Sequence, residues 1–192
     1  MQTVCQFTFP QHIAQSSIGG RQGSNACTII SVKFGDYCMQ HKLDVSLLWT
    51  SLFVNAICDG NDLYDEQYGD TAVYLDVEDV VQSVGTESNV QSISASVGFT
   101  NVHVFADLAA HVSNVQQPCY GVLIGCGKSV GIFVHTNGLC ALIDSQVHNN
   151  NGAIIVMADS PNNLINVYSR MLLEQNLVLN LVTFTWVQYT HE

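Results

Sequence analysis

Apolar residues recur every four positions through the first part of the chain. Beyond Gly23 they stand at Ala26, Ile30, Phe34 and Cys38. That spacing places them on one face of a helix. Ser24 or Asn25 precedes the run and has the side-chain oxygen of a helix N-cap. We therefore predict a helix of about 14 residues that buries one face and follows a polar, glycine-rich segment.

A second apolar pattern with helical spacing begins near Asp44. It covers much of the helix surface, which predicts a well-buried helix that ends at Asp59-Gly60-Asn61. A third, shorter amphipathic helix is predicted over Ala72–Val84. Before these helices, residues 1–18 alternate weakly and then meet Pro10, so we expect a short strand or extended arm there.

In the second half of the chain, apolar and polar residues alternate as they do in strands. Residues 92–105 alternate as a strand or bent hairpin would, and a short helix is expected over Asp107–Val115. The further predicted strands are Cys119–Gly125, Ser129–His135, Leu139–Asp144, Gly152–Ala158 and Leu177–Tyr189. Gly127-Lys128 and Asn137-Gly138 stand where hairpin turns are needed. Ser160-Pro161 opens a helix that runs to about Glu174.

Helices followed mainly by antiparallel strands predict an α+β fold. At 192 residues the chain is long enough for one domain with a sizeable core. We expect a single domain over residues 1–192, with a helical lobe at 1–90 and a sheet lobe at 91–192.

The charge balance excludes some classes of partner. Five Lys and Arg residues stand against 16 Asp and Glu, a net charge of −11. Nucleic acids and anionic membrane surfaces both need a basic surface, so neither is expected as a partner. Nine of the acidic residues lie between Asp59 and Glu87, without any Lys or Arg. They form either a solvated acidic face or a docking surface for a basic protein.

The cysteines indicate a reducing compartment. There are seven, widely dispersed and without a CxxC pair, in a chain with no recognisable signal peptide and no apolar run of roughly 18 residues. We expect free thiols and a cytoplasmic or nuclear protein. Neither a structural metal site nor a cofactor is expected, since zinc-type spacings and nucleotide-binding glycine motifs are absent from the sequence.

One cysteine stands where chemistry is favoured. Cys27 opens the first predicted helix, whose N-terminal partial positive charge favours a thiolate. It is either a nucleophile or a buried structural cysteine. A nucleophile needs a base and an orienting group, and Asp144 with His148 could supply both just beyond a predicted strand. Gln22, five residues before Cys27, has an amide suited to an oxyanion.

Three short segments carry a resemblance to a known family. Gly-Ser-Asn-Ala-Cys-Thr at 23–28, Leu-Ile-Asp-Ser at 142–145 and Gly-Ala-Ile-Ile at 152–155 resemble the deubiquitinases related to herpesvirus tegument proteases. The resemblance implies a papain-like fold and cleavage after the Gly-Gly tail of ubiquitin or a ubiquitin-like modifier. It also implies Cys27 as nucleophile and Asp144 as its acidic partner.

The sequence departs from that family at one position. The family's histidine comes two residues after the aspartate, where this chain has Gln146, whose amide cannot act as a general base. Three explanations remain open: His148 is the base, another histidine such as His135 or His103 takes its place, or the protein is an inactive relative. In the last case it would be a binding module for a ubiquitin-like or basic protein.

Overall fold

The computed structural model describes residues 4–41, 49–84, 86–100, 103–175 and 181–190. Its helices are α1 (Cys27–Gln40), α2 (Trp49–Tyr68), α3 (Val77–Val84), α4 (Val104–Val112) and α5 (Pro161–Glu174), with a short 3-10 turn η1 (Ile18–Gly20). Its strands are β1 (Val4–Thr8), β2 (Val90–Ile93), β3 (Val97–Thr100), β4 (Cys119–Gly125), β5 (Lys128–Val134), β6 (Cys140–Asp144), β7 (Ile154–Ala158) and β8 (Leu181–Tyr189).

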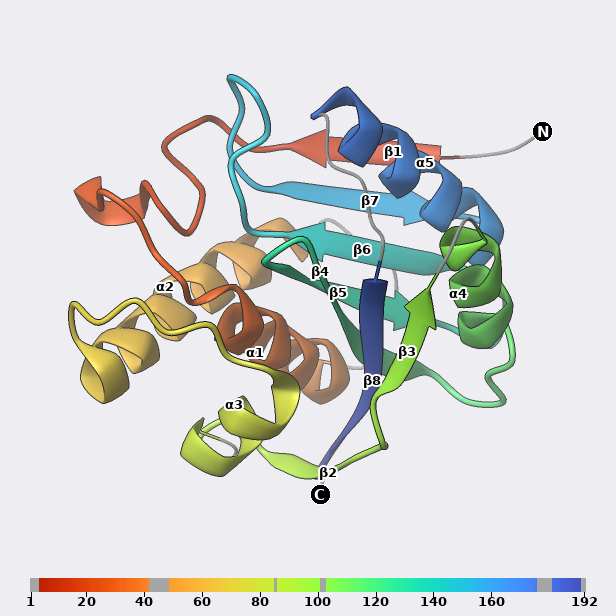
Figure 1. Cartoon of the computed structure of the whole chain (residues 1–192), viewed down its shortest axis with the longest axis horizontal. Coiled ribbons are helices and arrows are strands. Elements are labelled where there is room, and N and C mark those ends of the chain that lie inside the picture. The colour runs from red at the N-terminus through yellow and green to blue at the C-terminus, as the bar shows by residue number, and fades with distance from the viewer. Residues whose placement is uncertain (1–3, 42–48, 85, 101–102, 176–180, 191–192) are drawn as a thin grey trace.

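The strands form one eight-stranded antiparallel sheet. Its order is β1-β7-β6-β5-β4-β8-β2, and β3 also pairs with β8. The sheet twists strongly, so that the strand direction turns from β1 and β7 to the nearly perpendicular β8 in Figure 1. Because β1 pairs with β7, the first residues of the chain join strands from its second half.

Helices cover both faces of the sheet (Figure 1). One face packs against α1, α2 and α3, and the other packs against α4 and α5. Strand β6 shows the consequence: Ala141 and Ile143 point into the first core, whereas Cys140 and Leu142 point into the second. A strand covered on both faces is apolar at successive positions, which explains why every residue of β6 is buried.

Several elements confirm the sequence predictions, and with them the α+β class. Helix α1 has 14 residues, and β4 has the predicted bounds. Helix α5 begins at Pro161, and the Ser160 hydroxyl accepts a hydrogen bond from the Asn163 N–H at 3.3 Å. At α1 the residue in the N-cap position is Ala26, and its N–H donates to the Ser24 hydroxyl at 3.1 Å.

The predicted end of the second helix is wrong, because α2 continues through Gly60 to Tyr68. A Cβ at Gly60 would lie 2.5 Å from Cγ1 of Ile30 and 3.0 Å from its Cα, so this glycine permits close packing of α1 and α2. The buried Asn61 accepts from the Ser24 hydroxyl at 2.6 Å and donates to the Gln15 carbonyl at 3.1 Å. Its polar groups are thus paired inside the helix layer. The predicted start at Asp44 lies outside the described residues.

The third predicted helix begins later than expected, at Val77. The reason is a reciprocal cap, in which the Asp79 N–H donates to Asp76 at 2.8 Å and the Asp76 N–H donates to Asp79 at 3.1 Å. This cap fixes the start of α3 at Val77, five residues after Ala72.

Where the structure describes it, the region predicted as one strand or a bent hairpin, 92–105, forms neither. Strands β2 and β3 do not pair with each other, because each pairs with β8 from the end of the chain. The following helix, α4, begins at Val104 instead of Asp107. Both differences arise from long-range pairing that the local alternation does not encode. The first residues of the predicted last strand, 177–180, lie outside the described residues.

Replacing Asn61 by alanine tests the buried contacts of α2. The Asn61→Ala change leaves the Ser24 hydroxyl and the Gln15 carbonyl without this partner, so we expect the free energy of unfolding to fall by about 1–3 kcal/mol. Urea denaturation measures the change. The matched control is Asn55→Ala on the exposed face of the same helix, for which a change within about 0.5 kcal/mol is expected. Equal effects of the two substitutions would contradict this account.

Candidate active site

Cys27 is the first residue of α1 and is largely buried, with 7% of its surface exposed. Its neighbour Thr28 anchors this end of the helix: the Thr28 hydroxyl donates to the Leu75 carbonyl at 2.7 Å and lies 2.8 Å from the Ser129 hydroxyl. A hydroxyl has one proton, so Ser129 donates in the second bond. The start of α1 is therefore fixed beside the start of β5.

Asp144 is the last residue of β6 and is completely buried. In the antiparallel β5–β6 pair, Gly131 faces Ile143, so the end of β6 lies beside the start of β5. That is also the end of the sheet at which Thr28 contacts Ser129. The fold thus brings the Cys27 end of α1 and the carboxylate of Asp144 to the same end of the sheet.

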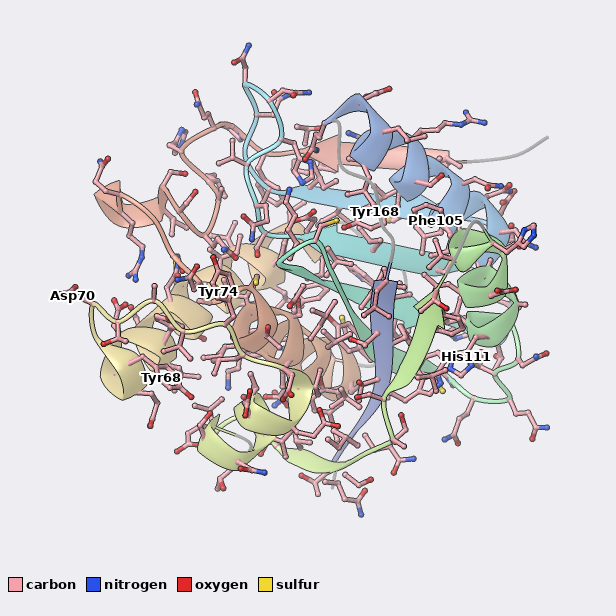
Figure 2. The ribbon with its side chains drawn as sticks, in the orientation of Figure 1. Tyr68, Asp70, Tyr74, Phe105, His111 and Tyr168 are labelled. Atoms are coloured by element: carbon pink, nitrogen blue, oxygen red, sulfur yellow. The ribbon has the colours of Figure 1, made fainter. Side chains whose placement is uncertain are left out.

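Tyr168 of α5, labelled in Figure 2, is near enough to Asp144 and Cys27 for their charge to act on its hydroxyl. Burial raises the pKa of the Tyr168 hydroxyl well above its usual value, and negative charge at Asp144, Cys126 and Cys27 raises it further. Tyr168 therefore stays a neutral phenol. Its position shows that α5, from the opposite helix layer, also reaches this end of the sheet.

His148 lies in the loop after β6, next to the acidic residue. Its backbone forms a two-way bridge with Asn151, at 3.0 Å and 2.9 Å. The ring nitrogen Nε2 is 3.1 Å from Oδ2 of Asp144, although the pair is not aligned as a hydrogen bond. The other carboxylate oxygen, Oδ1, accepts from the Gln146 N–H at 2.9 Å. Asp144 therefore holds the loop through one oxygen and faces the histidine with the other.

The second ring nitrogen of His148 contacts a residue that the sequence did not single out. Nδ1 is 2.8 Å from Nε2 of Gln175, the C-cap residue directly after α5. The Gln175 oxygen accepts from the Lys128 ammonium at 3.1 Å. Within the described parts of the chain, the His148 ring is paired with Asp144 and Gln175 and makes no hydrogen bond to the Cys27 thiol.

A buried glutamine joins the loops on either side of the site. Gln15 donates from Nε2 to the Ser24 carbonyl at 3.0 Å, and its Oε1 accepts from the Ser145 hydroxyl at 2.7 Å. The Gln15 N–H also donates to the Ser145 carbonyl at 2.8 Å. One side chain thus connects the approach to Cys27 with the residue after Asp144. A polar residue in the weakly patterned 1–18 segment gave no sequence signal for this role.

The backbone at Gly152 lies against the backbone of residues 9–13, which brings the β6–β7 loop and the N-terminal segment together. Gly152 donates from its N–H to the Phe9 carbonyl, and a Cβ there would lie 2.2 Å from the carbonyl oxygens of Pro10 and Ile13. Only a glycine fits so close to two carbonyl groups. The β6–β7 loop that carries His148 is therefore fastened to the N-terminal segment that carries Gln15.

The structure places the other predicted site residues as follows. Gln22 is exposed, and Asn25 is half-buried in the loop before Cys27. Gln146 contributes its backbone N–H to Asp144. His135 follows β5 in the turn toward β6, at the opposite end of these strands from Asp144. His103 is exposed and stands before α4, which packs against the other face of the sheet.

Many of the acidic residues between Asp59 and Glu87 have partners within the chain. Asp65 forms a bidentate ion pair with Arg21, with Nη1–Oδ2 and Nη2–Oδ1 distances of 2.7 Å and 2.5 Å. This ion pair lowers the pKa of Asp65. Asp59 accepts from the Tyr37 hydroxyl. Asp76 and Asp79 cap α3. These contacts give part of the acidic segment a structural role.

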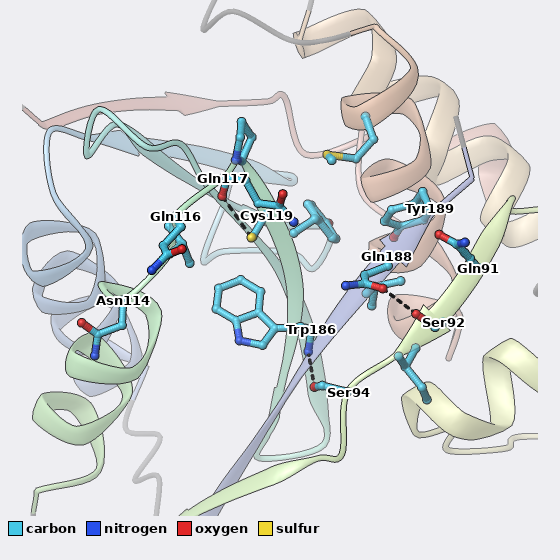
Figure 3. A pocket seen from close by; sticks show the side chains of 16 residues that line it. Gln91, Ser92, Ser94, Asn114, Gln116, Gln117, Cys119, Trp186, Gln188 and Tyr189 are labelled. Atoms are coloured by element: carbon cyan, nitrogen blue, oxygen red, sulfur yellow. Dashed lines mark hydrogen bonds between the residues drawn. The ribbon is translucent and has the colours of Figure 1, made fainter. Parts of the chain in front are cut away.

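A separate hollow of about 790 Å³ lies between β2, β8 and the segment before β4 (Figure 3). Its lining is uncharged and includes the labelled Gln91, Gln117, Trp186 and Gln188. Cys27, Asp144 and His148 do not line it. Across the described ranges, no group of three or more His, Cys, Asp and Glu side chains is arranged to hold a metal ion. Nor is any helix there long and apolar enough to cross a membrane.

Comparison with known sequences gives no relatives: no family model and no curated protein matches the chain. Solved structures do match. The ubiquitin-specific protease encoded by a murine cytomegalovirus tegument protein, solved with a ubiquitin-based suicide substrate, has a TM-score of 0.67 at 14% identity. That match covers 98% of this chain and 87% of the viral one.

Two bacterial structures match at lower scores. The Pseudomonas avirulence protein AvrPphB has a TM-score of 0.55 at 13% identity, over 85% of this chain and 92% of its own. The cysteine protease-like domain of the Photorhabdus asymbiotica toxin PaTox has a TM-score of 0.52 at 13% identity, over 97% of this chain and 54% of its own. The predicted papain-like fold is confirmed: the chain has the fold of a papain-like cysteine protease and resembles a viral deubiquitinase.

Proposed function

We propose that this protein is a cysteine isopeptidase that cleaves after the Gly-Gly tail of ubiquitin or a ubiquitin-like modifier. The observation that supports the proposal is that Cys27, at the start of α1, and the buried Asp144–His148 pair lie at the same end of the sheet. Similarity to a viral protease solved with a ubiquitin-based substrate supports the substrate class.

In the first step, the Cys27 thiol transfers its proton to His148 and its sulfur attacks the carbonyl carbon of the terminal glycine. Nε2 of His148 faces Asp144, so Nδ1 is the nitrogen that receives the proton. The buried carboxylate stabilises the imidazolium that results. Collapse of the tetrahedral intermediate breaks the C–N bond, and the imidazolium protonates the leaving amine, which leaves a thioester on Cys27.

In the second step, water attacks the thioester carbonyl while His148 removes a proton from the water. The C–S bond breaks, the tail leaves as a carboxylic acid that ionises, and Cys27 recovers its proton from His148. Backbone N–H groups in the first turn of a helix have no partner inside the helix, so the Cys27 N–H is available to the oxyanion in both steps.

Gln15 and Gln22 are the two candidates for a side-chain donor to that oxyanion. The Gln15 amide is buried and fixed between Ser24 and Ser145, which provides the preorganisation that oxyanion stabilisation requires. The Gln22 amide is exposed and lacks that burial. We therefore favour Gln15 over Gln22.

A surface beside the site supports a protein substrate. Tyr74 is 76% exposed and directly precedes Leu75, whose carbonyl accepts from Thr28 next to Cys27. Large exposed aromatic residues are common at protein interfaces. Asp70 and Glu66 lie nearby in sequence and are also exposed, which favours a substrate with a basic surface.

All seven cysteines are free thiols, which supports a reducing, cytoplasmic or nuclear location.

One observation favours a second candidate function, a binding module without activity. Nδ1 of His148, the nitrogen that would accept the thiol proton, contacts Gln175. An inactive relative would bind the modifier without forming a covalent bond to Cys27. Binding without covalent labelling in the next experiment would support this alternative.

We expect the wild-type protein to form a covalent adduct with ubiquitin that carries a C-terminal electrophile. Cys27→Ala should abolish the adduct because the nucleophile is lost. His148→Ala should slow its formation by about 10²- to 10⁴-fold, the usual contribution of a general base. Gel-shift analysis and intact mass measure the adduct. Cys5→Ser, an exposed thiol on β1, is the matched control and should react like the wild type. An unlabelled wild-type protein would refute the proposal.

The two glutamines can be separated by the same assay. Gln15→Ala should lower the labelling rate by about 10²- to 10³-fold if its amide binds the oxyanion, whereas Gln22→Ala should leave the rate within about twofold of wild type. Circular dichroism checks that both variants are folded. A large loss in Gln22→Ala together with an unchanged Gln15→Ala would reverse the assignment.

A further inference from the structure

Gln175 is the residue that links the end of α5 to the proposed base. Its backbone N–H donates to the carbonyls of Leu172 and Met171, at 3.1 Å and 3.3 Å, so the residue continues the last turn of the helix. Its side chain lies between Nδ1 of His148, at 2.8 Å, and the Lys128 ammonium, at 3.1 Å. The amide therefore bridges a base and a cation, and each of them constrains its orientation.

Lys128 determines which end of the amide faces the histidine. An ammonium group only donates hydrogen bonds, so the atom that meets it has to be the amide oxygen. The NH₂ group then points at His148. An amide NH₂ also only donates, so Nδ1 has to accept and carries no proton. The ring proton is consequently on Nε2, which faces the Asp144 carboxylate.

This bond affects the chemistry directly. With Nε2 turned to Asp144, Nδ1 holds the lone pair that would take the thiol proton, and the Gln175 amide occupies that lone pair. Once Nδ1 is protonated, two N–H groups would face each other. The amide therefore has to turn away before or during proton transfer from Cys27.

We propose that Gln175 is a positioning residue that holds His148 in its neutral Nε2–H tautomer and competes with the Cys27 thiol for Nδ1. The inference rests on the proposed function for the role of His148. In the step that it controls, the hydrogen bond from Gln175 to Nδ1 breaks, the S–H bond of Cys27 breaks and an N–H bond forms at Nδ1. The products are a thiolate and an imidazolium, with no other reactant. Gln175 thereby keeps the thiol in its less reactive form in this resting arrangement.

The test is the rate at which iodoacetamide alkylates Cys27 in the full chain, followed by peptide mass spectrometry at a fixed neutral pH. Gln175→Leu keeps most of the side-chain volume and removes the donor, so the rate should rise about fivefold, the usual effect of one neutral hydrogen bond. Lys128→Met frees the amide to rotate and should give a smaller rise of about twofold. Gln116→Leu, the same substitution at an exposed site before β4, should leave the rate unchanged.

A double substitution shows whether the effect passes through the histidine. In a His148→Ala background, Gln175→Leu should no longer raise the alkylation rate. An unchanged or lower rate in the single Gln175→Leu variant would overturn the proposal, as would a rise that persists without His148, since that result means only easier access to Cys27.

Nitrogen NMR of the His148 ring gives a readout that a merely structural role would not move. The wild type should show an unprotonated Nδ1 and a protonated Nε2, and Gln175→Leu should show both tautomers in exchange. A protonated Nδ1 in the wild type would overturn the inference. Neither measurement uses ubiquitin, so a failure of ubiquitin labelling with these results intact would count against the proposed function alone.

Discussion

The hydrogen bonds of the buried Gln15 hold the two halves of the site in place. Its side chain connects the Ser24 carbonyl, three residues before Cys27, with the Ser145 hydroxyl, one residue after Asp144. Asn61 closes the same network from α2 through Ser24 and the Gln15 carbonyl. A buried polar group without a partner costs about 1–3 kcal/mol, so loss of any member would expose the others to that cost. The position of Cys27 relative to Asp144 thus depends on this network as well as on the sheet.

Local sequence signals predicted the elements whose ends are set by their own residues. Helix α5 starts where Ser160 and Pro161 place it, and β4 follows Pro118 with its predicted bounds. The turn after β4 is formed by Cys126-Gly127, both with positive φ, one residue before the predicted Gly127-Lys128, because Lys128 already pairs with Gly125. The end of helix α2 could not be predicted in this way. Gly and Asn are favoured just past the end of a helix, but here Gly60 fits against Ile30 and Asn61 pairs with Ser24 and Gln15. Those contacts come from distant parts of the chain and leave no local pattern.

The residues of the candidate site also divide into those that the sequence could predict and those that it could not. Cys27 and Asp144 could be found because each stands at the end of a strongly patterned element, where side chains reach the edge of the core. His148 was one of several candidates, and the pairing of β5 with β6 separates it from His135. Gln15 and Gln175 could not be found, because an uncharged amide in a loop or at a helix end has no distinctive spacing. Only the structure shows that both amides are fixed by two partners.

Gln175 also has a consequence for how the two helix layers depend on each other. Cys27 belongs to the layer of α1, α2 and α3, whereas Gln175 directly follows a helix of the opposite layer. Asp144 and His148 lie at the end of the sheet that separates these two layers. Tyr168 of α5 is close enough to Asp144 and Cys27 for their negative charge to raise its pKa. In the role proposed for Gln175, the partner of Nδ1 depends on where α5 ends. That role couples the reactivity of the thiol to the packing of a helix that contributes no reacting atom.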